Sequence, residues 1–192
     1  MKDKPLHDSV RLSLPGWVLP FVEGGARSFP DDREKMRLAI DLSRKNVEEE
    51  TGGPFGAAIF ESDTGRLVSV GVNRVIPLNN STAHAEMMAF MLAQQRLGQY
   101  RLDATRNRFV LATSAQPCAM CYGACVWAGI NRILIGARRA DVESLTEFDE
   151  GPMPRNWIAG LKGRGITVRQ DVLRGEACRV LAEYQQTRGT VY

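Results

Sequence analysis

The sequence lacks any apolar run that approaches the roughly 20 residues needed to span a bilayer, so we expect no membrane partner. Its N-terminal segment mixes charge with proline and has no continuous apolar stretch of the signal-peptide kind, which predicts a cytoplasmic protein. Lysine and arginine form no cluster: 25 basic residues are interspersed with 22 acidic ones, for a net charge of +3. The chain therefore has little electrostatic footprint for holding a long nucleic acid, and we expect no nucleic-acid partner.

Histidine and cysteine are also scarce, with two and four residues respectively. Three of the cysteines, Cys118, Cys121 and Cys125, fall within eight residues of one another, which suits a metal site or a helix better than a disulfide framework. Of the two histidines, His7 lies in the proline-containing N-terminal segment. His84 is therefore the candidate imidazole ligand in the main body of the chain.

The length of 192 residues allows one domain with a well-buried core and is short for two. Prolines and the Gly24-Gly25 pair predict an irregular N-terminal arm over residues 1–29, and residues 30–192 then form a single domain. The chain has no internal repeat, low-complexity tract or linker that would divide it further.

Hydrophobic periodicity and turn residues predict an initial helix, a β-hairpin, and then strands that alternate with helices. Helices are expected from Pro30 to near Gly52 and at residues 83–97, 117–128, 142–148, 155–162 and 175–186. Strands are expected at residues 55–61, 67–72, 109–114, 133–135 and 166–172. This order predicts an α/β fold in which one mixed sheet is covered by helices on both faces.

The cysteine pair opens a predicted helix that begins with Pro117. Cys118 and Cys121 are three residues apart, so they share one face of the first turn, where unpaired N–H groups and the helix dipole favour thiolates. His84 falls at the start of another predicted helix. One imidazole and two thiolates give three protein ligands, and an open fourth position is typical of a catalytic Zn²⁺ site.

Glu86 stands two residues after His84, and at a helix N-terminus both side chains can lean toward a metal in front of the helix. Its carboxylate could then act as a general base without binding the metal. His84-x-Glu86 followed by Pro117-Cys118-x-x-Cys121 matches the signature of zinc deaminases that act on nucleobases. A non-catalytic, zinc-stabilised interaction module remains an alternative, although a structural zinc would need a fourth protein ligand.

Further motifs accompany this constellation, namely Gly53–Ala57, Asn73, Thr82–Glu86, Thr113–Cys121, Trp127–Gly129 and Phe148–Pro152. With them the chain, from about residue 30 to its end, resembles the cytidine-deaminase-like superfamily and, within it, the bacterial guanine deaminases. The resemblance implies a three-layer α/β/α sandwich around a mixed five-stranded sheet, a homodimer and a role in purine salvage. Gln116 departs from the family pattern, because many relatives have glutamate there.

The resemblance also implies residues that bind the substrate. An asparagine matching Asn73 contacts the base, although a residue after a strand can also serve a turn. Trp127 and Phe55 are candidates for the pocket wall or for plain core. Tyr192, the last residue, could reach over the active site of the partner.

An acidic residue after Phe148 is implied to read the amino edge of the substrate, and we assign that role to Glu150 rather than Asp149. Guanine presents N1–H and its 2-amino group as adjacent donors, and a carboxylate accepts both. Adenine and cytosine present an acceptor nitrogen there, so a buried carboxylate would reject them. We therefore expect deamination of guanine to xanthine, with ammeline as a related substrate. A tRNA adenosine deaminase and a cytosine or nucleoside deaminase are the alternatives.

Overall fold

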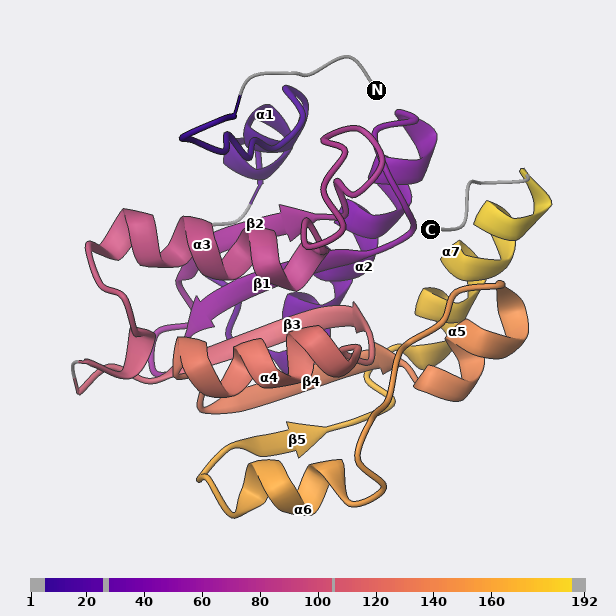
Figure 1. Cartoon of the computed structure of the whole chain (residues 1–192). Coiled ribbons are helices and arrows are strands. Elements are labelled where there is room, and N and C mark those ends of the chain that lie inside the picture. Colours follow the sequence, from indigo (N-terminus) through magenta and orange to yellow (C-terminus); the bar gives the residue numbers. More distant parts are fainter. Residues whose placement is uncertain (1–5, 26–27, 105, 188–192) are drawn as a thin grey trace.

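The computed structural model describes residues 6–25, 28–104 and 106–187, and its centre is a mixed five-stranded sheet with strand order β2-β1-β3-β4-β5 (Figure 1). Strand β1 pairs antiparallel with β2 and with β3, whereas β3–β4 and β4–β5 are parallel. The strands are β1 Gly56–Glu61, β2 Leu67–Val72, β3 Phe109–Ala115, β4 Arg132–Ala137 and β5 Thr167–Arg169. The predicted hairpin and mixed sheet are thus confirmed.

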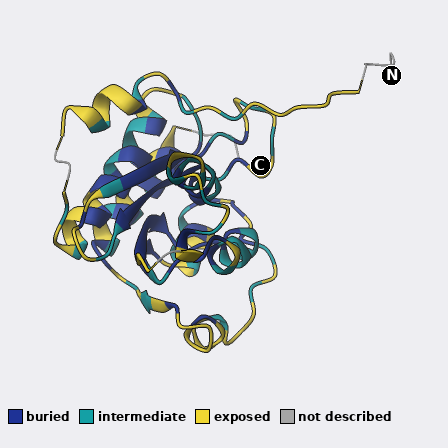
Figure 2. Ribbon diagram, turned by 90° about the vertical axis from the view of Figure 1, so that its left-hand side faces the viewer, coloured by how far each residue is buried: buried dark blue, intermediate teal, exposed yellow. Residues whose placement is uncertain are grey.

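Helices cover both faces of the sheet, as predicted, and alternate strand residues face each layer. On β1, Ala58 and Phe60 lie on the face covered by α2, α5 and α7, whereas Ala57 and Ile59 lie on the face covered by α3, α4 and α6. Buried residues accordingly concentrate in the sheet and on the inner helix faces (Figure 2). The helices are α2 Asp32–Glu48, α3 Ala85–Leu97, α4 Ala119–Ala128, α5 Arg139–Leu145, α6 Trp157–Lys162 and α7 Arg174–Gln186, with a 3₁₀ turn at Leu102–Ala104.

Helix α3 lies unusually close to β2 because Gly71 has no side chain. A Cβ atom at Gly71 would lie 2.0 Å from the carbonyl oxygen of Ala85, the first residue of α3. This close approach holds the N-terminus of α3 against the sheet, next to the residues that form the site. None of the described helices is both long and apolar enough to cross a bilayer.

The N-terminal arm is not wholly irregular, contrary to the sequence-based prediction. A short helix, α1 Val18–Glu23, packs on the domain through the fully buried Val18. Just before it, the indole N–H of Trp17 donates to the hydroxyl of Thr51 at 3.0 Å. Apolar residues spaced for one helical turn gave too weak a periodic signal between the prolines of this segment.

Two predicted elements near the C-terminal end differ from the structure. Helix α5 ends at Leu145, so Phe148 lies in the following loop rather than in the helix. The backbone N–H of Phe148 donates to the hydroxyl of Thr146, which itself donates to the carbonyl of Val142 at 2.6 Å and closes the helix. The last strand is confined to β5, because Asp171 and Leu173 adopt positive φ angles that end the extended backbone.

Candidate active site

Three metal-binding side chains meet in front of the N-termini of two helices, close to the C-terminal end of the central strand β3. His84 is the N-cap residue of α3, Cys118 is the N-cap residue of α4, and Cys121 is the third residue of α4. Their donor atoms all lie within 4.8 Å of one another, with Nδ1 of His84 3.6 Å from Sγ of Cys118. The structure therefore brings together the three ligands that the sequence predicts, although Cys118 precedes the first turn instead of belonging to it.

The electrostatics of this group suit a divalent metal. The hydrogen bond from the thiol of Cys121, with the nearby imidazole of His84, lowers the pKa of Cys118 to about 4. Donation to the Cys118 sulfur, together with burial, raises the pKa of Cys121 well above its ordinary value. One thiolate is thus present at neutral pH, and the second forms when a metal displaces its proton. Two sulfur ligands and one nitrogen fit the preferences of zinc.

Glu86, the second residue of α3, lies behind the metal-binding group. It is buried, its Oε2 lies 3.4 Å from the sulfur of Cys121, and its Oε1 accepts from the hydroxyl of Thr113 at 3.2 Å. Burial raises the pKa of the Glu86 carboxyl above its ordinary value. His84 and Glu86 can face the same point because His84 is an N-cap residue with an extended backbone, ψ 158°, and does not follow the helical spacing.

A cavity of about 90 Å³ opens onto this group. Two aromatic rings form part of its wall, with the ring centres of Phe55 and Phe148 5.1 Å apart in an edge-to-face arrangement. The cavity is lined by Phe55, His84, Glu86, Ala115, Gln116, Cys118, Phe148, Asp149 and Glu150. Metal-binding groups, a buried carboxyl and both acidic candidates of the Phe148–Glu150 segment therefore surround one small space.

The two acidic candidates have different environments. Glu150 is only 8% exposed, and its carbonyl oxygen accepts from the backbone N–H of Ala119 at 3.1 Å, which ties it to the start of α4. Burial, with the Cys118 thiolate and Glu86 nearby, raises the pKa of Glu150 to about 8. Asp149 is exposed, and its Oδ1 accepts from the N–H of Gly151 at 2.8 Å in a turn. Of the two, Glu150 is the buried acidic group beside the metal-binding residues.

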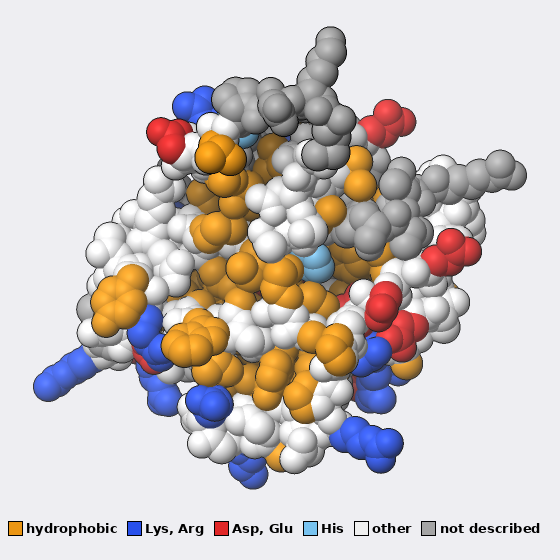
Figure 3. Space-filling model, in the orientation of Figure 1, with side chains coloured by type: hydrophobic (Ala, Val, Ile, Leu, Met, Phe, Trp, Pro, Cys, Tyr) orange, Lys and Arg blue, Asp and Glu red, His pale blue; other side chains and the backbone are white. Residues whose placement is uncertain are grey.

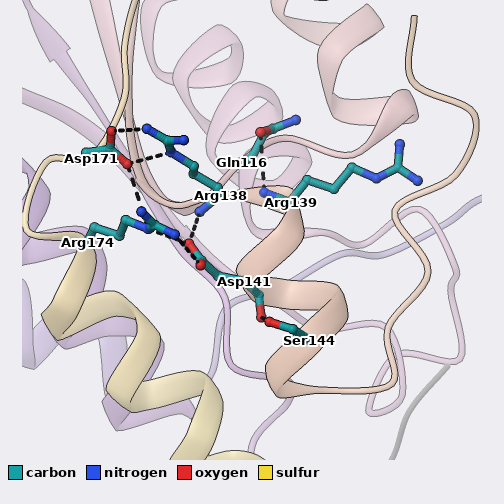
Figure 4. A network of polar contacts seen from close by, with 7 residues as sticks. All are labelled: Gln116, Arg138, Arg139, Asp141, Ser144, Asp171 and Arg174. Atoms are coloured by element: carbon teal, nitrogen blue, oxygen red, sulfur yellow. Dashed lines mark hydrogen bonds and ion pairs between the residues drawn. The ribbon is translucent and has the colours of Figure 1, made fainter. Parts of the chain in front are cut away.

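A polar network anchors the helix that precedes this segment (Figure 4). The side-chain oxygen of Gln116 accepts from the first backbone N–H of α5 at 3.3 Å. Arg138, the N-cap residue of α5, pairs with Asp171, and Asp141 in the first turn pairs with Arg174 at the start of α7, with N–O distances of 2.5 and 2.6 Å. These contacts fix where α5 begins, and α5 in turn leads into the loop that carries Phe148 and Glu150.

Two further candidates, Trp127 and Asn73, do not line this cavity. Trp127 is 76% exposed and lies nine residues after Cys118 on α4, about 13 Å along the helix. It is therefore neither core nor a wall of this cavity. Asn73 is buried, but its Oδ1 accepts from the N–H of Val75 at 3.2 Å, as in a turn. Tyr192 lies outside the described residues.

An α/β/α sandwich that presents one histidine and two cysteines at helix N-termini, with a buried carboxyl beside them, has the site of the zinc deaminases that act on nucleobases, in which His/Cys/Cys ligands accompany a glutamate. The chain belongs to the cytidine and deoxycytidylate deaminase family, whose zinc-binding region matches residues 30–137. The resemblance found in the sequence is thereby confirmed.

Solved structures and curated relatives agree with this family. The chain is similar to the guanine deaminase of Nitrosomonas europaea, with a TM-score of 0.88 and 40% identity over 95% of this chain and 100% of that one. It is also similar to an asparagine-to-alanine variant of NE0047 in complex with 8-azaguanine, with a TM-score of 0.88 and 41% identity over 93% and 98% of the two chains. The guanine deaminase of Bacillus subtilis is 38% identical over 106 residues, which cover 55% of this chain and 64% of that enzyme.

Proposed function

We propose that this chain is a zinc-dependent guanine deaminase that hydrolyses free guanine to xanthine and ammonia. The observation that carries the proposal is the buried carboxyl of Glu150 in the same small cavity as His84, Glu86 and Cys118. Two relatives that are named guanine deaminases support the choice of base. One of them has a solved structure and is 40% identical to this chain.

The recognition of guanine follows from the chemistry of the cavity. Glu150 must be ionised to accept hydrogen bonds from N1–H and the 2-amino group, the two adjacent donors of the base. A zinc ion held by the neighbouring ligands would favour the ionised form against the raised pKa of this carboxyl. The rings of Phe55 and Phe148 offer apolar contact to a planar heterocycle. A cavity of about 90 Å³ is well below the roughly 300–1,000 Å³ of common ligand pockets, which argues against a nucleoside as the substrate. A contact from Asn73 to the base stays a prediction.

In the proposed mechanism, His84, Cys118 and Cys121 hold zinc, which when bound supplies the Lewis acidity that makes water a nucleophile at neutral pH. Glu86 takes a proton from the attacking water on its carboxylate and passes it to the ring nitrogen beside C2. The water oxygen forms a bond to C2, and the bond from C2 to the amino nitrogen breaks. The second proton comes from the hydroxyl group formed on C2: Glu86, or Glu150, transfers it to the amino nitrogen, which leaves as ammonia while the C2 carbonyl of xanthine forms.

An ammonia-release assay tests the proposal. Zinc-loaded protein is incubated separately with guanine, ammeline, adenine, cytosine, guanosine, cytidine and a tRNA substrate. We expect release from guanine, with ammeline as the second-best substrate and the others near background. Release from adenosine in tRNA but not from guanine would overturn the choice of substrate. A Glu86→Gln variant that retains zinc is the control for chemistry, and undiminished release from it would contradict the role of Glu86.

We further propose that the protein is a homodimer that associates through the face formed by α3 and α4. Hydrophobic side chains gather on this face (Figure 3), and Tyr100 and Trp127 are 83% and 76% exposed there. Both line a groove of about 420 Å³ with Met87, Met91 and Ala124 from the two helices. A second copy of the chain would cover these side chains.

Sedimentation of wild type and Trp127→Glu checks the proposed dimer face. We expect a dimeric wild type and a monomeric variant, and a dimeric variant would contradict the assignment of the face. The cytoplasmic location and the division at residue 30 stay predictions.

A further inference from the structure

A buried hydroxyl lies behind the catalytic carboxyl, on the face of β3 that packs toward α3 and α4. Thr113 is 2% exposed, and the preceding residues on the same face of the strand, Phe109 and Leu111, are apolar core residues. A hydroxyl in such a position destabilises the fold unless it is hydrogen-bonded. Its partners are Oε1 of Glu86 at 3.2 Å and the carbonyl oxygen of Ala115 at 3.0 Å.

The two oxygens of the Glu86 carboxyl therefore have different neighbours. Oε2 lies 3.4 Å from the sulfur of Cys121, on the side of the metal-binding group. Oε1 contacts Thr113, which belongs to the central strand and not to a loop or to α3. A carboxyl held at one oxygen by a rigid element loses the freedom to rotate, so its other oxygen keeps one direction.

We propose that Thr113 is a positioning residue for the deamination reaction: its hydroxyl holds Oε1 of Glu86 so that Oε2 faces the metal-binding group and the substrate. This role rests on the catalytic role proposed above for Glu86. A hydroxyl suits the task because it both donates and accepts. It donates to Oε1 of a carboxylate, and it accepts from a protonated Oε1 while donating to the carbonyl of Ala115, which lines the cavity.

The alternative is that Thr113 only satisfies its own hydroxyl against the strand, with no effect on the reaction. The two possibilities separate in the pair Thr113→Val, which keeps the shape and removes the hydroxyl, and Thr113→Ser, which keeps the hydroxyl and removes the methyl group. We expect Thr113→Val to lower kcat roughly 10- to 100-fold, the usual effect of removing a hydrogen-bond partner from a metal-site residue. KM, zinc content and the affinity for 8-azaguanine stay within about twofold of wild type, because no ligand or substrate contact is lost.

Thr113→Ser is expected to recover kcat to within about threefold of wild type. If packing of the side chain were what mattered, loss of the methyl group would instead lower kcat in Thr113→Ser and spare Thr113→Val. A crystal structure of Thr113→Val should show the Glu86 carboxyl rotated away from its wild-type direction. Wild-type kcat in Thr113→Val, or equal impairment in Thr113→Ser, would overturn the proposal. If Thr113→Val does not fold, Thr113→Ala replaces it and is compared with Thr113→Ser in the same way.

Failure of this inference is distinguishable from failure of the proposed function. All variants are assayed with the base that gives the fastest ammonia release from the wild-type protein, whichever base that is. An active Glu86→Gln variant with full zinc would refute the role of Glu86 and, with it, that of Thr113. An inactive Glu86→Gln beside a fully active Thr113→Val would refute only the positioning role.

Discussion

The two sides of the cavity are built from different kinds of structure. On the metal side, His84, Glu86, Cys118 and Cys121 all lie within the N-cap and first turn of α3 and α4, helices packed on the buried sheet. On the side that we propose recognises the base, called the recognition side below, Phe148 and Glu150 belong to an irregular segment between α5 and α6. The difference suggests that the reaction is set by the rigid framework, and the choice of base by a loop that can change without disturbing it.

A backbone hydrogen bond connects the two sides directly. The backbone bond from Ala119 N–H to the carbonyl oxygen of Glu150, at 3.1 Å, joins the recognition segment to the start of α4. Gly71, by contrast, lets α3 pack so closely on β2 that no side chain would fit between them. Substitutions on the metal side should therefore abolish the reaction, whereas those on the recognition side should change which substrate reacts and how tightly it binds.

The largest effect is expected on the metal side, for Cys121→Ser. A serine hydroxyl is a poor zinc ligand beside a thiolate, so zinc content and ammonia release should both fall to background. Cys125→Ala is the matched control, because Cys125 lies one turn further along α4 and is fully buried in the apolar core. It should keep zinc and activity and lose only stability, as measured by metal analysis and thermal unfolding. Zinc loss in Cys125→Ala would show that the metal site extends deeper into α4.

The next effect is expected on the recognition side, for Glu150→Gln. The amide presents an N–H₂ group to the donor edge of guanine, so kcat/KM for guanine should fall roughly 10²- to 10³-fold while zinc is retained. Asp149→Asn is the control, since Asp149 is exposed and its amide can still accept from the N–H of Gly151. It should stay within about threefold of wild type. The reverse ranking of the two variants in steady-state kinetics would assign substrate recognition to Asp149.

The same division explains what the sequence predicts. The ligands and Glu86 are recognisable because helix N-termini are marked locally by Pro117, by spacing and by the residue types that zinc binds. The sheet and its two helical layers follow from periodicity, although α1 was missed and α5 was placed about three residues late. Local patterns of this kind therefore predict most of the residues on the metal side and few of those on the recognition side.

The remaining site residues depend on contacts between distant segments. Nothing in the sequence pairs Thr113 with Glu86, although a threonine on an apolar strand, four residues before Pro117, is a signal that could have been noticed. Trp127 matched a family motif, but its position on α4 places it about 13 Å along the helix from Cys118. Only the three-dimensional arrangement separates Glu150, which is buried, from its exposed neighbour Asp149.

A smaller effect is expected for Phe148→Leu, which removes one of the two rings from the cavity wall. A contact between this ring and bound guanine, as proposed above, contributes about 0.5–1.5 kcal/mol beyond the area it buries, so its loss should raise KM for guanine roughly 3- to 10-fold with kcat nearly unchanged. Phe29→Leu is the control, because Phe29 forms a similar pair with Phe60, 5.3 Å between ring centres, outside the cavity lining. It should lower thermal stability and leave KM unchanged. A large loss of kcat in Phe148→Leu would contradict this, because it would show that the ring affects the chemical step and not only the binding of the base.

The smallest effect is expected where the two sides meet, at Gln116. Gln116→Ala leaves the first N–H of α5 without its side-chain acceptor, a loss of about 1 kcal/mol that should lower Tm by roughly 2–4 °C. Gln116→Glu keeps the acceptor and places a negative charge at a helix N-terminus, which is favourable, but in a cavity that already holds Glu86 and Glu150. These opposing effects should leave Tm near that of wild type.

Because Gln116 holds no ligand, zinc content should be unchanged and kcat should stay within about threefold of wild type in both Gln116 variants. A tenfold loss of kcat or a loss of zinc in Gln116→Glu would show that the charge of the recognition side acts directly on the chemistry, and the separation between the two sides would not hold.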